Sequence, residues 1–328
     1  MRIAVTGSIA TDHLMTFRGR FHDSLLVEQL DKVSLSFLAD QLDIRRGGVG
    51  GNIAFGLGVL GLSPVLVGAA GQDFADYRSW LQRHGVDCAS VLVSDTEHTA
   101  RFVCTTDDDL AQIATFYAGA MTRAREVELG PIVERVGGLD LVLVGPNDPE
   151  AMLRHTDECR SRHIPFAADP SQQLASMDGS QIRRLIDGAS YLFTNEYEAH
   201  LTEQRTGWSE GDISARVGTR IITRGRDGAY ISSHGSDPIH VEAVPASFVA
   251  DPTGVGDAFR AGFLAGLAWG LSLPGCARVG ALMATYVVET VGTQEYEHNL
   301  DTFATRLADA YGPQVADEVT PHLPDGLR

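Results

Sequence analysis

Lysine is almost absent from this chain of 328 residues, in which Lys32 is the only one. The phosphate loop of P-loop NTPases places a lysine directly behind a glycine-rich turn, whereas Lys32 follows Leu30 and Asp31. A P-loop NTPase is therefore excluded. Any phosphate group that this chain binds must be held by backbone N–H groups, by arginine side chains or by a metal ion.

Positive charge is scarce in general. The 26 Lys and Arg residues face 43 Asp and Glu residues, which gives a formal net charge of −17 at pH 7. Nucleic acids and anionic membranes are bound by clustered Lys and Arg, so this balance argues against both as partners. The acidic excess is better explained by solubility.

Cysteines and long apolar runs are also few. The four cysteines, at positions 88, 104, 159 and 276, form no Cys-x-x-Cys pair. With no secretory signal at the N-terminus, they predict reduced thiols in a cytoplasmic protein. The nearest approach to a membrane span, residues 261–277, is interrupted by Ser272 and Pro274, which favours two buried helices.

Short apolar runs alternate with helical patterns over most of the chain. We expect strands at 3–6, 65–68, 139–145, 166–168, 191–194 and 220–223, and helices at 73–84, 149–162, 178–187 and 196–205. This alternation predicts an α/β fold with one mostly parallel sheet covered by helices on both faces. Ligands of such a sheet bind beyond the carboxyl ends of its strands.

Two stretches, residues 13–46 and 98–121, break this alternation. The second contains β-prone segments at 99–106 and 112–117 with no crossover helix between them. Two antiparallel ribbons inserted there predict a small β-sheet lid over the active site. The large α/β domain would then comprise residues 1–12, 47–97 and 122–328. A lid excludes water from the site when it closes.

The most informative motif is Asp251-Pro-Thr-Gly-Val-Gly-Asp-Ala-Phe259, at the expected start of a long helix. Thr253 is a natural N-cap, and Gly254 and Gly256 leave N–H groups uncovered at the positive end of the helix dipole. A phosphoryl group in transfer needs such donors, and Asp257 can accept a proton from the attacking hydroxyl. Capping alone explains these residue types equally well. The helix N-terminus predicts a lowered pKa for Asp257, hence a weak base.

This motif resembles the C-terminal signature of the ribokinase-like (PfkB) carbohydrate and nucleoside kinases. Pro252 stands where threonine is frequent and Val255 where alanine is frequent, but neither change removes the N–H groups at the glycines or the carboxylate. Residues 47–54, Gly-Gly-Val-Gly-Gly-Asn-Ile-Ala, resemble the N-terminal signature of the same family. The resemblance implies a ribokinase-like fold with a β lid, a catalytic Asp257, and an anion hole formed by the backbone of Gly254, Val255 and Gly256.

The acceptor side of the site is expected near the N-terminus. Asp12 follows the first expected strand, and one carboxylate can accept hydrogen bonds from two vicinal hydroxyls; a turn Asp bonded to its own backbone is the alternative. Gly48 allows close backbone approach and Asn52 offers both a donor and an acceptor, although a flexible loop explains the glycines as well. The resemblance implies that Asp12, Ser8, Gly48 and Asn52 bind the sugar part of the acceptor.

Residues 195–198, Asn-Glu-Tyr-Glu, follow a strand and open a helix. Carboxylates and an amide at a strand end suit a Mg²⁺ ion that keeps most of its waters, but acidic residues also belong in a first helical turn for dipole reasons. The resemblance implies that Asn195 helps to position the nucleotide phosphates and that Glu198 holds Mg²⁺, through water.

Two further segments have implied roles on the ATP side. Residues 223–228 lie between two expected strands and are consistent with a plain hairpin turn. The resemblance implies that Thr223, Gly225 and Gly228 contact ATP. It also implies a potassium site at Asp251 and Thr253.

Gly56-Leu-Gly-Val-Leu-Gly61 matches the Gly-x-Gly-x-x-Gly pattern of dinucleotide-binding proteins. That pattern must follow a strand and open a helix, whereas this one lies within or at the end of a helix that begins near Asn52. Close packing of small residues explains it better, which argues against a dehydrogenase.

The acceptor must be identified from residues outside the kinase signatures. From residues 7–13 through Asp169-Pro-Ser-Gln-Gln-Leu174 to the C-terminal signature, the chain resembles the adenosine kinases of actinobacteria. Phe102 and Phe116 fall on the two expected lid strands, where aromatic rings can clamp a purine, although strand aromatics are more often core. The amides of Gln172 and Gln173 can pair with adenine, although loop glutamines are usually only solvated.

The resemblance therefore implies ATP-dependent phosphorylation of the 5′-hydroxyl of adenosine, giving AMP and ADP for purine salvage. It also implies a homodimer formed through the lid strands. A ribokinase or another PfkB sugar kinase and a non-catalytic nucleoside sensor are the alternatives.

Overall fold

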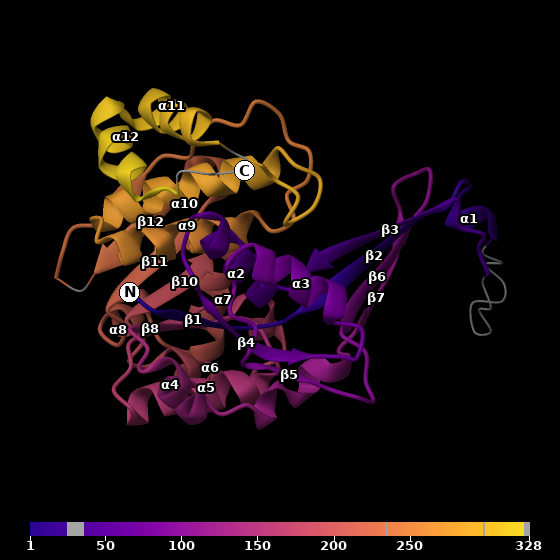
Figure 1. Cartoon of the computed structure of the whole chain (residues 1–328), viewed down its shortest axis with the longest axis horizontal. Coiled ribbons are helices and arrows are strands. Elements are labelled where there is room, and N and C mark those ends of the chain that lie inside the picture. Colours follow the sequence, from indigo (N-terminus) through magenta and orange to yellow (C-terminus); the bar gives the residue numbers. More distant parts are fainter. Residues whose placement is uncertain (25–35, 234, 298, 325–328) are drawn as a thin grey trace.

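The computed structural model describes residues 1–24, 36–233, 235–297 and 299–324. Lys32 and part of the expected lid segment 13–46 lie outside the described residues. The body of the molecule is a layered α/β structure, and a smaller sheet extends from one side of it (Figure 1). The expected fold class is confirmed.

The main sheet has nine strands within the described residues, in the order β13-β12-β11-β10-β9-β8-β1-β4-β5. Pairing is parallel from β11 to β5 and antiparallel for β12 and β13. The strands are β1 (Ile3–Thr6), β4 (Val65–Ala70), β5 (Val91–Val93), β8 (Leu141–Val144), β9 (Phe166–Ala168), β10 (Tyr191–Asn195), β11 (Thr219–Thr223), β12 (Ala229–Ser233) and β13 (Ile239–Val241). Every strand expected in the body is present.

Helices cover both faces of this sheet because its parallel strands bury side chains on both sides. In β1, Ile3 and Val5 join the core on one face, and Ala4 joins the core on the other. The first face is covered by α2 (Val49–Val59), α3 (Ala75–Arg83), α9 (Val255–Trp269), α10 (Leu273–Val288), α11 (Leu300–Tyr311) and α12 (Pro313–Val319). The second is covered by α4 (Leu129–Val136), α5 (Pro149–Ser161), α6 (Gly179–Ile186), α7 (Glu196–Thr206) and α8 (Glu210–Ser214).

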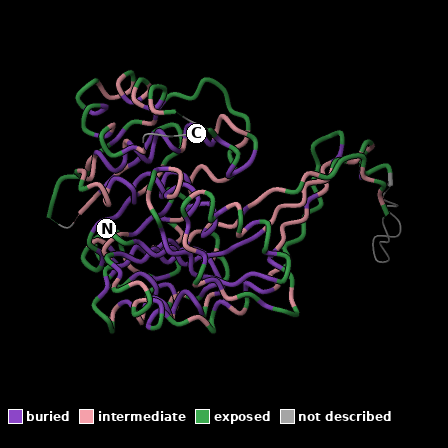
Figure 2. Tube along the Cα trace, viewed as in Figure 1, coloured by how far each residue is buried: buried purple, intermediate pink, exposed green. Residues whose placement is uncertain are grey.

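The smaller sheet has the order β3-β2-β6-β7 and is built from two antiparallel ribbons. Its strands are β2 (Ala10–Thr16), β3 (Gln41–Gly47), β6 (Ala100–Thr106) and β7 (Gln112–Tyr117), and β2 and β6 run parallel where the ribbons meet. The short α1 (Phe21–Ser24) lies near its tip. Figure 2 shows that the main sheet is largely buried, whereas the small sheet is mostly half-buried or exposed.

Residues 261–277 are shared between α9 and α10, as expected for two buried helices rather than one span. Among the described residues, no helix has both the length and the apolar character needed to cross a membrane.

The glycines of the Gly56 to Gly61 segment serve helix packing. Gly56 and Gly58 lie within α2, which precedes β4 rather than following a strand. A Cβ atom at Gly56 would come within 2.7 Å of the Ala261 Cβ atom on α9, and one at Gly58 would meet the carbonyl oxygen of His84. The packing interpretation of this motif is confirmed.

We therefore predict that Gly58→Ala lowers the free energy of unfolding by about 1–3 kcal/mol, because the added methyl group must displace a backbone carbonyl. Urea denaturation measures this change. Gly211→Ala is the matched control, since the exposed Gly211 lies in α8 with no atom closer than 3.8 Å to the added Cβ. The control should be neutral or stabilising by about 0.5–1 kcal/mol. An equal loss in both variants would contradict the packing role of Gly58.

Candidate active site

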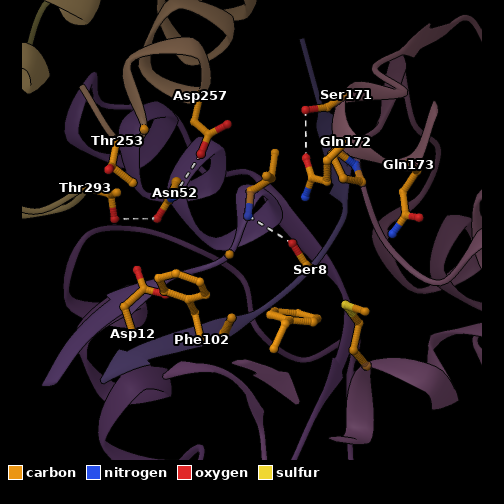
Figure 3. A pocket seen from close by; sticks show the side chains of 17 residues that line it. Ser8, Asp12, Asn52, Phe102, Ser171, Gln172, Gln173, Thr253, Asp257 and Thr293 are labelled. Carbon is orange, nitrogen blue, oxygen red and sulfur yellow. Dashed lines mark hydrogen bonds between the residues drawn. The ribbon is translucent and has the colours of Figure 1, made fainter. Parts of the chain in front are cut away.

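A cavity of about 490 Å³ lies where the small sheet meets the start of α9. Its volume is within the usual range for small-molecule sites. The residues predicted for the site that line it are Ser8, Asp12, Gly48, Asn52, Phe102, Phe116, Gln172, Gln173, Thr253, Gly254 and Asp257. Figure 3 shows Asp257 and Asn52 on one side of the cavity, with Phe102 and Asp12 on another. All the residues expected on the acceptor side thus meet in one place.

The first turn of α9 differs from the expectation at its cap. The N-cap is Gly254, with φ 78°, and no side chain caps the helix, so the expected Thr253 cap is wrong. A Cβ atom at Gly254 would lie 2.7 Å from Cγ2 of Thr293, which excludes larger residues there. The N–H of Thr253 instead donates to Oδ1 of Asp251 at 2.9 Å.

Backbone donors at this helix start are available to a ligand. Within the described part of the chain, the N–H groups of Gly254, Gly256 and Asp257 have no protein acceptor, and that of Val255 makes only a long 3.5 Å contact with the carbonyl of Pro252. The helix has 15 residues, so its dipole favours negative charge at this end. The geometry suits an anion, as the glycine pattern predicts.

Asp257 has a higher pKa than its helix position predicts. Burial raises the pKa of this carboxyl to about 7. A hydrogen bond from Nδ2 of Asn52 to Oδ2 of Asp257, 2.8 Å long, and the positive charge of Arg260 oppose that rise. The expectation of a lowered pKa is therefore wrong, because loss of hydration outweighs the helix dipole. A carboxyl that titrates near neutrality is a better general base than an ordinary aspartate.

Asp12 lies inside strand β2, where its neighbours are Arg45 on β3 and Phe102 on β6, so the turn interpretation is wrong. Burial, together with the negative charge of Asp251, raises the pKa of Asp12 to about 6, and Arg45 opposes this rise. A partly buried carboxylate at the cavity wall can accept hydrogen bonds from hydroxyl groups of a ligand.

Ser8 and Gly48 bring β1 and α2 close together at the cavity. Oγ of Ser8 accepts the N–H of Val49 at 3.0 Å, at the start of α2. Gly48 has φ 87°, and a Cβ atom there would lie 2.6 Å from the backbone of Ser8 and of Ala10. Gly48 is therefore required by the close backbone approach, whichever ligand binds.

Aromatic and amide groups line another part of the cavity. Phe102 and Phe116 are direct register partners on β6 and β7. Gln172 and Gln173 lie in the 3₁₀ helix η3 (Ser171–Ala175), which follows β9. Oε1 of Gln172 accepts a hydrogen bond from Ser171, and Oε1 of Gln173 accepts one from Ser176. Both glutamines line the cavity.

The residues expected on the ATP side lie outside the cavity lining. Asn195 and Glu198 form a capping box at the start of α7, with bonds of 2.7 and 2.8 Å. Asn195 is the register partner of Thr223, so these two lie together at the carboxyl ends of β10 and β11. Gly225 and Gly228 follow in the connection to β12. A Cβ atom at Gly228 would lie 2.1 Å from the carbonyl oxygen of Val241, which gives this glycine a packing role.

The carboxylate of Glu198 suits a Mg²⁺ ion that keeps most of its waters. Among the described residues there is no group of three or more His, Cys, Asp or Glu side chains able to hold a metal by itself. The capping box uses one oxygen of Glu198, Oε2, and the negative charge of Glu198 also raises the pKa of Asp257. A single available carboxylate oxygen suits Mg²⁺ bound mainly through water and substrate phosphates.

The expected potassium site at Asp251 and Thr253 lies beside the loop that contains Val291 and Gly292. Oδ2 of Asp251 accepts the N–H of Gly292 in a long 3.4 Å contact. The neighbouring carbonyl of Val291 accepts a 2.6 Å hydrogen bond from Nη1 of Arg45, so a guanidinium already contacts this loop. Oxygen ligands for a cation are present, but one of them is engaged by an arginine.

An ion pair that sequence reasoning missed lies behind Asp257. Arg260, one helical turn further along α9, is 5% exposed and its Nη2 donates to Oδ1 of Asp169 at 2.7 Å. Its Nη1 donates to the carbonyl oxygen of Gly256 at 3.0 Å. Arg260 thus connects the end of β9 to the peptide beside Asp257. A lone arginine within the apolar run of α9 is the sequence signal that could have revealed this pair.

Comparison with known proteins identifies the family. A family model described as pfkB family carbohydrate kinase matches residues 8–299. A nucleoside kinase of Methanothermobacter thermautotrophicus is 32% identical over 76% of this chain and 80% of its own length. A nucleoside kinase of Methanocaldococcus jannaschii is 28% identical over 93% of this chain and 96% of its own length.

Solved structures agree with this assignment. The Burkholderia thailandensis nucleoside kinase, solved in complex with inosine, superimposes with a TM-score of 0.83 at 35% identity, covering 94% of this chain and 99% of that one. These relatives are named nucleoside kinases rather than adenosine kinases. The family resemblance inferred from the two signatures is confirmed, and the narrower resemblance to actinobacterial adenosine kinases stays a prediction.

We predict that Arg260→Met lowers the free energy of unfolding by about 3–5 kcal/mol at pH 8, because it leaves the carboxylate of Asp169 buried and unpaired. Burial raises the pKa of Asp169 to about 6 even with Arg260 in place, and loss of the arginine raises the folded pKa further above its unfolded value. Stability is then lost as the pH rises, and the loss is smaller at pH 5 than at pH 8.

Urea denaturation at both pH values measures this effect. Arg184→Met is the control, since the exposed ion pair of Arg184 with Asp157 contributes about 0–1 kcal/mol. Adding Asp169→Asn to Arg260→Met should recover part of the stability and reduce the pH dependence, leaving the part that comes from Asp257, whose pKa Arg260 also lowers. A pH-independent loss in the single variant would contradict the ion-pair explanation.

Proposed function

The chain belongs to the pfkB family of carbohydrate kinases, and on that premise we propose that it transfers the γ-phosphoryl group of ATP to the 5′-hydroxyl of adenosine, giving AMP and ADP. The observation that carries this proposal is the composition of the cavity. Asp12, Asn52 and Asp257 lie in the same cavity as the register pair Phe102 and Phe116.

A nucleoside accounts for both parts of this lining. Asp12 and Asn52 offer acceptors and a donor for sugar hydroxyls, as a free sugar would also require. The two phenylalanines and the amides of Gln172 and Gln173 have no role for a free sugar, whereas they can stack on and hydrogen-bond with a purine. The nucleoside kinases among the relatives, one of them solved with inosine, support a nucleoside acceptor.

The proposed reaction depends on positioning and on stabilisation of charge. Asp12 holds the ribose hydroxyls, with Ser8 and Gly48 shaping the cavity beside it. Asp257 accepts the hydrogen bond, and then the proton, of the 5′-hydroxyl as this oxygen attacks phosphorus. Phosphoryl transfer passes through a loose transition state, so orientation of the hydroxyl matters more than its early deprotonation. The N–H groups of Gly254, Val255 and Gly256 stabilise the charge on the transferring group.

ATP would be held beyond the anion hole, at the ends of β10 and β11. Asn195 and Thr223 lie there as neighbours, and Gly225 and Gly228 shape the following turn. Glu198 would hold Mg²⁺ through water, and bound Mg²⁺ neutralises charge on the phosphates. We also propose that Asp251 and Thr253 bind potassium behind the anion hole.

The remaining features follow from the same proposal. Residues 13–46 and 98–121 act as the lid of a catalytic body formed by residues 1–12, 47–97 and 122–328, although β2 begins at Ala10, so Asp12 itself lies in the small sheet. Two chains pair through exposed strands of the small sheet to form a homodimer. The reaction takes place in the cytoplasm and serves purine salvage. No part of this proposal involves nucleic acid or a membrane surface.

We predict that, in a panel of acceptors assayed by ATP consumption, kcat/KM is highest for adenosine and near background for ribose and fructose. The panel also includes inosine and guanosine, so that the base is varied while the ribose is kept. A preference for inosine or guanosine would retain a nucleoside kinase but overturn adenosine as acceptor. Turnover of free sugars alone would favour the sugar-kinase alternative, and nucleoside binding without turnover would favour the sensor.

We predict that Asp257→Asn lowers kcat by about 10²–10⁴-fold, because it removes the base while keeping a side chain of the same shape. Nucleoside affinity, measured by calorimetry, and the melting temperature should change little. Asp309→Asn is the control, since Asp309 is exposed on α11, away from the cavity. Near-normal turnover by Asp257→Asn would refute the assignment of Asp257 as base.

A further inference from the structure

Behind Asp257, on the side away from the cavity, buried and partly buried hydrogen bonds connect the catalytic carboxyl to Trp80 on α3. Nε1 of Trp80 donates to Oε1 of Gln294 at 3.1 Å. Nε2 of Gln294 donates to Oδ1 of Asn52 at 2.9 Å, and Nδ2 of Asn52 donates to Oδ2 of Asp257 at 2.8 Å. Gln294 is 1% exposed and neither it nor Trp80 lines the cavity.

The direction of these bonds is set at the Trp80 end. An indole N–H can only donate, so the side-chain atom of Gln294 that faces it must be the carbonyl oxygen. The amide nitrogen of Gln294 then faces Asn52 and Tyr77, and the hydroxyl of Tyr77 donates onward to the carbonyl of Gly47 at 2.9 Å. Since Gln294 donates to Asn52, the oxygen of Asn52 faces Gln294 and its nitrogen faces Asp257.

Without Gln294, the amide of Asn52 would have two self-consistent orientations. In the observed one it donates to the Asp257 carboxylate, and its oxygen lies 2.9 Å from Oγ1 of Thr293. In the reversed one it would accept from a protonated Asp257 and donate to Thr293, whose hydroxyl could then donate to the carbonyl of Arg46, 3.0 Å away. Thr293 accommodates either orientation because a hydroxyl both donates and accepts. Only the donor from Gln294 distinguishes the two.

We propose that Trp80 and Gln294 are positioning residues that hold Asn52 as a hydrogen-bond donor to Asp257 and so keep this carboxyl in its base form. The inference rests on the proposed function, since the base form matters only where Asp257 accepts a proton. It gives Trp80 a part in the reaction although its side chain lies outside the cavity. It also assigns Asn52 a second task besides contact with the acceptor.

Substitution of Trp80 or Gln294 leaves the other charged residues around this network unaltered in the sequence. Asp257 is also influenced by Arg260 on its own helix, by Asp169 after β9 and by Glu198 on α7, and it faces Tyr296. At the other end, Arg46, Arg83 and His84 lie against the ring of Trp80. Trp80→Phe keeps an aromatic ring against Phe55 and these groups, and removes the indole N–H.

The direct test is titration of the Asp257 carboxyl in the ligand-free full-length protein, by carbon-13 NMR of labelled aspartate. The Asp257 signal is assigned by its loss in Asp257→Asn. In Trp80→Phe and in Gln294→Met the pKa of this carboxyl should rise by about half to one pH unit, because the bond that favours its charged form is weakened. Trp269→Phe is the matched control, since Trp269 stacks on His322 at the far end of α9 and should leave the pKa unchanged.

Kinetics provide the second readout. In both variants the acid limb of kcat/KM should move to higher pH by the same amount, with activity within about twofold of wild type above this limb. A uniform loss of activity at all pH values, with an unchanged carboxyl pKa, would assign Trp80 and Gln294 a purely structural role and overturn the proposal. An unchanged pKa with unchanged kinetics would overturn it as well.

The two proposals fail in different experiments. If the wild-type chain turns over no acceptor in the panel, the proposed function fails, while the carbon-13 titration still reports whether the network sets the protonation of Asp257. If turnover is normal and the titration is the same in every variant, the proposed function stands and the positioning role of Trp80 and Gln294 is wrong.

Discussion

The Asp257 carboxyl occupies a position where two large electrostatic effects oppose each other. The helix dipole and uncovered N–H groups at the start of α9 favour negative charge, whereas burial disfavours it. Burial prevails, and the pKa rises to about 7. The result combines two properties that a phosphoryl-transfer site needs at one point: donors for an anion, and a carboxyl able to exchange a proton near neutral pH. The contacts around Asp257 maintain this balance between the helix dipole and burial.

The cavity exists because two sheets contribute to it. The main sheet and its helices supply Asn52 and Asp257, and the small sheet supplies Asp12 and the pair of phenylalanines. Asp12 lies within β2, so its place depends on pairing with β3 and β6 rather than on a local turn. Movement of the small sheet against the body would therefore move the Asp12 carboxylate and the two aromatic rings together. If the small sheet closes as the proposed lid, its contacts with a ligand would change as one unit.

Local patterns predicted the strands and helices of the body, because alternation of apolar runs and turns is a property of neighbouring residues. The two signatures predicted that Gly48, Asn52, Gly254 and Asp257 belong to one site for the same reason, since each signature is a continuous segment, and these residues line one cavity. Three features were not predicted from the sequence. The N-cap of α9 is Gly254, which lies against Thr293, rather than Thr253; the raised pKa of Asp257 comes from burial; and the Arg260 to Asp169 ion pair joins segments far apart in sequence. Each depends on tertiary contacts that no sequence window contains.

Those tertiary contacts also explain why so many polar groups are buried on the far side of Asp257. A buried ion pair adds little net stability over apolar packing, and a buried amide costs free energy unless every bond is made. Yet Arg260 donates a hydrogen bond to the carbonyl of Gly256, and Gln294 donates one to the amide oxygen of Asn52. Apolar replacements could fill the same space, but they could not determine which atom of the Asn52 amide faces the carboxyl. Under the proposal made above, the buried amide of Gln294 lowers stability but sets the orientation of the donor that faces Asp257.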